Sequence, residues 1–203
     1  MKLKRIFFLV LAFALVGTAS AFADEAVEMY KGRKVKVAVN GETLDVPGIL
    51  LTVDGISKTM LPSRDVADKL QAMVYWDDET RTVYISKPNV HITLTQPLKD
   101  NVIGMFAQVY YKNHYDFVVF TQMDNLPENI RAVKFEITDP YGHVVTEGEH
   151  VFESYPGKMY WLPFKASMKF DYVGTYKVKV YMKSDAEDRY FLVSEKLLES
   201  TQK

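Results

Sequence analysis

The sequence predicts a mainly-β fold in two parts, a small α+β domain with strands around one helix and an immunoglobulin-like antiparallel β-sandwich. Three observations favour this fold. Apolar and polar residues alternate from Val35 onwards, one short helical pattern follows Ser63, and a series of short strand patterns separated by turn residues follows Pro88. The chain has 203 residues, of which 48% are hydrophobic, and is long enough for two such domains.

The first 23 residues have the pattern of a secretory signal peptide. Lys2, Lys4 and Arg5 precede an apolar run over residues 6–16, and Ala21-Phe22-Ala23 forms an A-x-A cleavage site. The alternative is an uncleaved anchor, but a membrane span needs about 20 apolar residues and this run is shorter. We therefore expect a secreted, extracellular protein that can associate with the cell wall, with no membrane span after signal cleavage.

Charge and cysteine content exclude several partners and sites. Without residues 1–23 the chain has 22 basic and 26 acidic residues, and this net charge of −4 argues against nucleic-acid binding. The absence of cysteine excludes disulfides, thiolate metal sites and cysteine nucleophiles.

The first predicted domain covers residues 34–87. Val35, Val37 and Val39 alternate with other residues and lead into Asn40-Gly41, a strong hairpin signal because both residues accept a positive φ. The remaining predicted elements are strands over residues 44–46 and 49–53, a short helix capped by Ser63, and a hairpin over residues 74–85.

Four segments of this domain follow one another in a specific order. They are Val39-Asn40-Gly41, Thr59–Arg64, Leu70–Asp77 and Thr82–Ile85. Together they resemble the copper amine oxidase N-terminal-like domain, or stalk domain, of secreted Gram-positive proteins. Gln71 departs from the pattern, which favours glycine after the helix leucine. The resemblance implies a non-catalytic spacer or binding module, because copper and the quinone cofactor of those oxidases belong to a different domain.

Three residues of the resemblance have predicted physical roles. Pro62 fits the start of the helix with its fixed φ, and Arg64 would tie that start to a carboxylate or carbonyl. Trp76 is expected in the core, with a hydrogen-bond partner for its indole N–H. Ligand binding by Arg64 and Trp76 is the alternative.

The second predicted domain covers residues 88–203. Asp171–Tyr176 resembles the tyrosine corner of immunoglobulin-like domains, in which the hydroxyl of Tyr176 would bond back to the chain. A turn is expected at Glu147-Gly148. The predicted strands cover residues 90–95, 103–111, 117–122, 133–138, 143–146, 150–154, 159–164, 175–182 and 190–194.

The sequence contains no recognisable catalytic or nucleotide-binding motif. His143 and His150 flank the predicted turn and leave a surface metal site open, as Asp77-Asp78-Glu79 leaves a calcium site open. Solvent-facing histidines and ordinary turn chemistry are the favoured interpretations. We therefore predict no enzyme activity, no cofactor and no bound metal.

Aromatic residues, 13% of the chain, are the remaining lead to a binding site. Tyr141, Tyr155 and Trp161 lie near predicted turns of the second domain and are candidate binding residues, since flat rings can stack on sugars. The other interpretation is core filling. Trp161 alternates with Tyr160 and Leu162 along one strand, so one of the two faces must be buried.

These observations predict a non-catalytic cell-envelope protein, a binding or spacer module for cell-wall polysaccharide, peptidoglycan or an envelope surface protein. The alternative is a secreted protein–protein interaction module, an inhibitor or assembly subunit that uses sandwich loops or an edge strand. A hydrolase would need convergent titratable groups, which the sequence does not reveal.

Overall fold

A computed structural model describes residues 32–53, 55–97 and 103–203. Strands contain 62% of these residues, with one short helix and several antiparallel sheets, which confirms the predicted mainly-β fold. Two compact units are present, residues 32–35 with 48–60 and residues 36–47 with 61–203, and each is described by itself. The domain boundary at Pro88 stays a prediction, as does the signal peptide, which lies outside the described residues. Within these ranges no helix is long and apolar enough to cross a membrane.

The first unit is a three-stranded antiparallel sheet in the order β1–β4–β5. Gly55 has a φ of 76° in the turn that joins β4 to β5, a conformation that suits glycine. Ile49, Ile56 and Met60 lie on one face of this sheet and are exposed. The strands are β1 (Arg33–Val35), β4 (Gly48–Val53) and β5 (Ile56–Met60).

The second unit begins with small elements. Asn40 and Gly41 have φ values of 53° and 85° and form the predicted hairpin turn. The predicted Ser63 cap is wrong, because the helix begins at Ser63, its N-cap is Pro62, and no side chain caps it. The elements are β2 (Ala38–Val39), β3 (Glu42–Thr43), α2 (Ser63–Lys69), β6 (Met73–Asp77) and β7 (Thr82–Ser86).

The end of α2 keeps its expected geometry although glycine is absent. Gln71 adopts a φ of 54°, and its N–H donates to the carbonyl of Asp68 at 3.1 Å. The N–H of Ala72 donates to the carbonyl of Ala67 at 2.8 Å. These two bonds satisfy carbonyls that the last turn of a helix leaves free, so a glutamine here carries the strain that glycine would avoid.

Ion pairs tie α2 to the loop after β15 (Gly174–Ser184). Arg64 donates two hydrogen bonds to the carboxylate of Glu187, at 2.9 and 3.1 Å, which confirms a carboxylate partner for Arg64. Arg189 in the same loop donates to Asp68 at 2.9 Å. The helix is thus held at its start and near its end.

The prediction that Trp76 lies in the core is wrong. Its side chain is on β6 and the residue is 47% exposed, beside the exposed Val83 of β7. The indole N–H does have the expected partner, since it donates to Asp78 Oδ1 at 3.1 Å. A two-stranded ribbon cannot bury both of its faces without a further layer, and the buried residues of β6 are Met73 and Val74 at its start.

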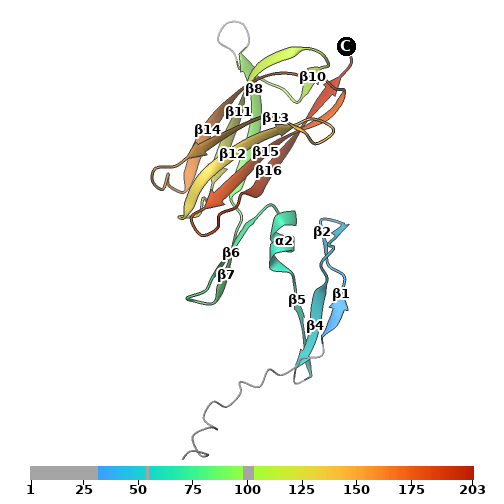
Figure 1. The fold of residues 1–203 in the computed structure, drawn as a ribbon, viewed down its shortest axis with the longest axis vertical. Helices are drawn as coiled ribbons and strands as arrows, with labels where there is room; N and C mark the ends of the chain where they lie inside the picture. Colours follow the sequence, from blue (N-terminus) through green and yellow to red (C-terminus); the bar gives the residue numbers. More distant parts are fainter. Residues whose placement is uncertain (1–31, 54, 98–102) are drawn as a thin grey trace, which may run out of the picture. The chain divides into compact units, whose positions relative to one another are not determined.

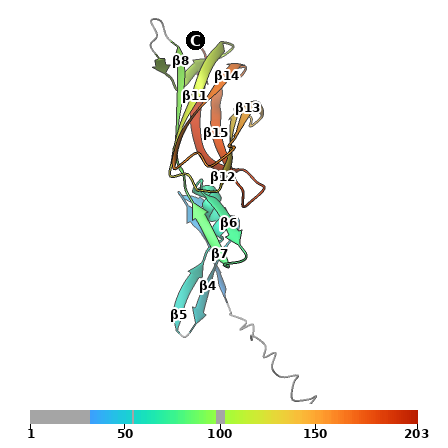
Figure 2. The same cartoon turned by 90° about the vertical axis from the view of Figure 1, so that its left-hand side faces the viewer.

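Residues 89–97 and 103–201 form a β-sandwich whose two layers are visible in Figures 1 and 2. One sheet has five strands in the order β10–β16–β15–β12–β13, and the other has four in the order β14–β11–β8–β9. All pairings are antiparallel except that of β10 with β16. The strands not yet named are β8 (Asn89–Pro97), β9 (Ile103–Met105), β10 (Gln108–Tyr110), β11 (His114–Asp124), β12 (Ile130–Thr138), β13 (Val144–Val151), β14 (Met159–Lys169) and β16 (Phe191–Thr201).

Two strand predictions in the sandwich are wrong. The strand expected over residues 103–111 is two short strands, β9 and β10, in different sheets. The two strands expected on either side of Glu147-Gly148 are one strand, β13. Gly148 lies inside that strand. A glycine is needed at this position because the ring of Phe164 occupies the space where a Cβ would lie. The glycine therefore allows close packing of the two sheets and does not mark a turn.

Aromatic rings join the two sheets in the core. Phe135 on β12 stacks on Phe164 of β14 with centroids 5.2 Å apart. Tyr176 is 1% exposed and packs edge-on against Phe170 at 4.9 Å. The N–H of Tyr172 donates to the hydroxyl of Tyr176 at 3.1 Å, which confirms the predicted bond back to the chain. Membership of the immunoglobulin-like class stays a prediction.

Candidate functional site

The outer face of the four-stranded sheet is built by strand alternation. Along β14, Leu162, Ala166 and Met168 point into the core and are buried, so the residues between them point outward. β11 alternates in the same way and pairs with β14 over its full length. The outward residues of the two strands are Met159, Trp161, Pro163, Lys165, Ser167 and Lys169 on β14, and His114, Asp116, Val118, Phe120, Gln122 and Asp124 on β11.

Trp161 and Phe120 form an aromatic platform on this face. Their rings meet edge to face, with centroids 5.6 Å apart, and Trp161 is 57% exposed. The core-filling interpretation therefore fails for Trp161, although it holds for the inward Leu162 of the same strand. A partly exposed ring held by a neighbouring ring is a rigid apolar surface that a ligand can cover.

Polar side chains surround the platform. Gln122 lies opposite Trp161 in the register of β11 and β14, and opposite His91 in the register of β11 and β8. Its Nε2 donates to Asp124 Oδ2 at 3.2 Å, which leaves its carbonyl oxygen as an acceptor. A flat apolar surface with amide, imidazole and carboxylate groups beside it can hold a ligand that has both apolar faces and hydroxyl groups.

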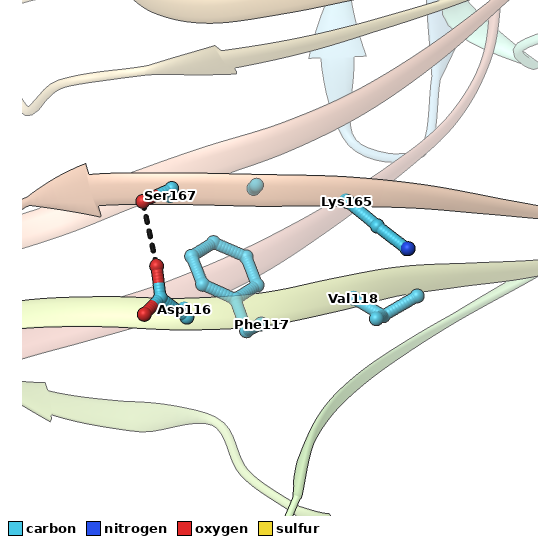
Figure 3. A pocket seen from close by; sticks show the side chains of 6 residues that line it. Asp116, Phe117, Val118, Lys165 and Ser167 are labelled. Carbon is cyan, nitrogen blue, oxygen red and sulfur yellow. Dashed lines mark hydrogen bonds between the residues drawn. The ribbon is translucent and has the colours of Figure 1, made fainter.

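A hollow of about 310 Å³ lies between β11 and β14, further along the same two strands (Figure 3). Asp116, Val118, Lys165 and Ser167 line it from the outer face, together with the core residues Phe117 and Ala166. The side chain of Lys165 reaches from β14 toward Val118 on β11 (Figure 3). The hollow thus brings a carboxylate, an ammonium group, a hydroxyl and an apolar side chain together.

Ser167, Asp116 and His114 form a hydrogen-bonded chain beside the hollow. The hydroxyl of Ser167 donates to Asp116 Oδ1 at 2.6 Å and lies 2.9 Å from His114 Nε2. Because the hydroxyl hydrogen points to Asp116, Nε2 of His114 is the donor to Ser167. The hydrogen bond from Ser167 and the neighbouring His114 hold the pKa of Asp116 below its usual range despite some desolvation, so this carboxylate is ionised at neutral pH.

This trio is not arranged as a Ser–His–Asp catalytic triad. A triad needs the carboxylate on Nδ1 of the imidazole and the serine on Nε2. Here Asp116 Oδ1 lies 3.4 Å from His114 Nε2, the same nitrogen that faces Ser167. The Ser167 hydroxyl donates its hydrogen bond to the Asp116 carboxylate and not to the histidine, as a triad would require. The geometry is suited to hydrogen bonding a ligand and not to nucleophilic attack.

The structure separates the three predicted binding residues. Tyr141 follows β12 and Tyr155 follows β13, whose antiparallel pairing places them at opposite ends of β12. Trp161 lies on the outer face of the other sheet. Because β12 has nine residues, its ends are about 26 Å apart. The three residues therefore do not form one site.

Tyr155 and Tyr141 have different local roles. The hydroxyl of Tyr155 donates to the carbonyl of Leu126 at 3.2 Å, so this hydroxyl joins two loops. Tyr141 is 71% exposed and packs edge to face on Tyr172 with centroids 5.0 Å apart. Asp139 fixes this turn by accepting from the backbone N–H groups of Tyr141 and His143, each at 2.9 Å.

The two metal sites left open by the sequence have no support in the structure. His143 precedes β13 and His150 is near its end, about 23 Å apart along an extended chain. Asp77 accepts from the N–H groups of Glu79 and Thr80 and from the Thr80 hydroxyl, which is ordinary turn chemistry. Among the described residues no group of three or more metal-ligating side chains is present.

Sequence reasoning missed Phe120 and the polar residues around the hollow. The strand predicted from Phe117 begins at His114 in the structure, so His114 and Asp116 were not assigned to a face. Extending the alternation backwards from Val118 would place both on the side of Phe120. Their closeness to Ser167 also depends on strand pairing between residues 51 positions apart, for which the sequence has no signal.

Comparison with known proteins supports the resemblance of the first part of the chain. Residues 38–104 match the family model of the copper amine oxidase N-terminal domain. This is a non-catalytic, stalk-type domain, so the matched part of the chain is not itself catalytic. The match runs from β2 into β9 and leaves β11 and β14 outside it. A search of curated proteins finds no match to the chain.

Proposed function

We propose that the protein is a secreted, non-catalytic component of the cell envelope that binds a cell-wall polysaccharide through the outer face of the four-stranded sheet. The exposed platform of Trp161 and Phe120 carries this proposal. A pyranose ring has apolar faces and a rim of hydroxyl groups, and the platform with Gln122, His91 and Asp124 beside it matches both features. The predicted signal peptide and the match to a non-catalytic domain agree with an extracellular binding role.

Co-sedimentation of the purified protein with isolated Gram-positive cell wall tests the proposal. Trp161→Ala should weaken binding by about tenfold or more, because a central exposed tryptophan is a typical energetic anchor of a binding surface. Trp76→Ala is the matched control, since Trp76 is the other tryptophan and is also about half exposed, at 47%. It should leave binding unchanged.

Two results would contradict the proposal. If the protein fails to sediment with the wall and with every envelope extract, wall binding is wrong. If it sediments but Trp161→Ala and Trp76→Ala behave alike, the outer face of the four-stranded sheet is not the site.

An edge strand favours a second candidate function, binding of an extended protein segment. Among the described strands, β13 pairs with β12 alone and is the last strand of its sheet. The N–H of Phe152 donates to the carbonyl of Arg131 at 2.9 Å, so by antiparallel alternation the N–H groups of Glu147 and Glu149 face the free edge. These two acids would repel their equivalents in a second copy, and they favour a basic partner that adds as a strand.

A pull-down from culture supernatant tests this second candidate. A specific partner should be captured by the unchanged protein and lost with Glu147→Pro, which removes an N–H from the free edge. Capture that persists with Glu147→Pro would place the partner elsewhere.

A further inference from the structure

We propose that the hollow between β11 and β14 recognises the acetamido group of an N-acetylated amino sugar. This inference rests on the proposed function, since it names the class of polymer that the outer face binds. It uses residues that the aromatic platform does not use, so the two can be tested separately.

The size of the hollow limits how much of a ligand it can hold. At about 310 Å³ it is at the lower end of the range of ligand pockets, which is about 300–1,000 Å³. It is open to solvent along the sheet, beside exposed Ser167 and Lys165. A space of this size accommodates a substituent or one ring of a polymer whose other rings lie along the sheet.

The lining groups match the three parts of an acetamido group. Asp116 Oδ2 makes no hydrogen bond within the described residues and can accept from an amide N–H. The ammonium group of Lys165 has no ion-pair partner in the same ranges and can donate to an amide carbonyl. Val118, which lies opposite Lys165 and two residues from Asp116 on β11, is part-buried and offers an apolar contact for the methyl group.

The same groups disfavour other wall polymers. On this face the carboxylates of Asp116 and Asp124 are matched by the ammonium groups of Lys165 and Lys169, so there is no net positive charge that would favour a strongly anionic chain. A sugar with hydroxyl groups alone can donate an O–H to Asp116, but it has no amide carbonyl for the Lys165 ammonium group and no methyl group for Val118. An amide that carries a methyl group supplies all three contacts.

The spacing along β14 connects the hollow to the platform. Trp161 and Lys165 are four residues apart on one strand, which places them about 13 Å apart on the same face. Pro163 and Phe120 lie between them and keep this path apolar. One polymer chain can therefore stack a ring on Trp161 and place the substituent of another ring in the hollow.

Co-sedimentation with chitin and with cellulose tests the inference. Both are insoluble β-1,4-linked polymers, cellulose of glucose and chitin of N-acetylglucosamine, so they differ in the acetamido group that replaces the C2 hydroxyl in chitin. We expect the protein to bind chitin about tenfold or more tightly than cellulose, because a charged hydrogen bond to the amide is lost in cellulose. Lys165→Met and Asp116→Ala should each reduce chitin binding toward the level of cellulose.

Matched variants separate this inference from the proposed function. Trp161→Ala should weaken binding to both polymers, whereas Lys165→Met should leave cellulose binding unchanged. Lys177→Met, which alters a half-exposed lysine on the five-stranded sheet, should change neither. Melting midpoints of all four variants establish that each is folded.

The outcomes are distinguishable. Equal binding to chitin and cellulose, or chitin binding that does not respond to Lys165→Met and Asp116→Ala, overturns the acetamido inference. Wall binding that depends on Trp161 but comes without chitin binding also overturns it, while the proposed function stands. Binding to none of the three preparations overturns both.

Discussion

The two outer faces of the sandwich differ in how their polar groups are used. On the five-stranded sheet, Glu136 accepts from Lys134 at 3.2 Å, from the Tyr181 hydroxyl at 3.2 Å and from Lys179 at 3.5 Å. The ammonium group of Lys134 also lies 4.9 Å from the centroid of the Tyr181 ring. On the four-stranded sheet, Trp161 is exposed and Lys165 has no ion-pair partner among the described residues.

This difference separates a surface whose polar groups bond with one another from the surface that we propose for ligand binding. Burial raises the pKa of Glu136, but the hydrogen bonds and charges of Lys134, Tyr181 and Lys179 outweigh that effect and lower it. Burial and the charge of Glu136 raise the pKa of Tyr181 to about 12. These groups already bond with one another, so a ligand would gain little from them. On the other face, Asp116 Oδ2 and the Lys165 ammonium group make no such bond within the described residues, so they can bond with a ligand.

The largest effect should come from Gly148→Ala, which disturbs the packing that holds both faces on one scaffold. A methyl group at Gly148 would collide with the ring of Phe164, and Phe164 cannot move easily because it stacks on Phe135. We expect a loss of about 3 kcal/mol in the free energy of unfolding, measured by urea denaturation. Gly142→Ala, at a turn with open space around it, would also be strained at its φ of 88° but would not collide. Equal losses at the two positions would contradict the packing role of Gly148.

Removing one acid from each outer face tests the comparison directly. Glu136→Ala leaves two partly buried lysines without their carboxylate and should cost about 2 kcal/mol. Asp116→Ala removes an exposed carboxylate and should leave the melting midpoint unchanged. If the two variants lose the same stability, the acids of the two faces do not differ in their contribution to the fold.

Alkaline pH should weaken the five-stranded face. The pKa of Tyr181 is about 12 in the folded protein against an ordinary value of 10.0. The folded state therefore holds this proton more strongly than the unfolded state, and the resulting stability is complete below pH 10 and lost as the pH rises through about 12. Urea midpoints measured from pH 9 to 12 should fall less steeply for Tyr181→Phe than for the unchanged protein. Identical slopes would show that the Tyr181 hydroxyl does not titrate in this way.

A smaller effect is expected at the tyrosine corner, away from both outer faces. Tyr176→Phe removes the acceptor of the Tyr172 N–H but keeps the ring that packs on Phe170. The free energy of unfolding should decrease by about 1 kcal/mol, with sugar binding unchanged. A melting midpoint equal to that of the unchanged protein would mean that this bond does not contribute to stability.

Local signals in the sequence predicted local structure well. Asn40-Gly41 indicated a hairpin because both residues accept a positive φ, and the structure has that turn. Pro62 and Arg64 indicated the start of a helix with an ionic partner, although the sequence could not tell that the partner would be Glu187, 123 residues away. The exposure of Trp76 was missed because an aromatic residue in an alternating strand pattern favours a core position whether or not a layer covers it.

The candidate site depends on tertiary pairing and was predicted only in part. Trp161 could be named because alternation along its own strand places its side chain on the other face of the strand from that of Leu162. Phe120 and Asp116 belong to the site only because β11 pairs with β14 in one register. The wrong turn prediction at Gly148 has the same cause. A glycine between two glutamates is typical of a turn, and only the packing of the Phe164 ring against it, from another strand, explains a glycine inside β13.

Pro163 has a consequence for how this face behaves at high concentration. β14 is the outer strand of its sheet, and an uncovered strand with exposed Trp161 and Met159 is a template on which further chains could add and grow into fibrils. A proline in the middle of the strand removes one of the N–H groups on which such growth depends. The exposed aromatic platform can therefore stay uncovered at high protein concentration while the addition of further strands at β14 is disfavoured.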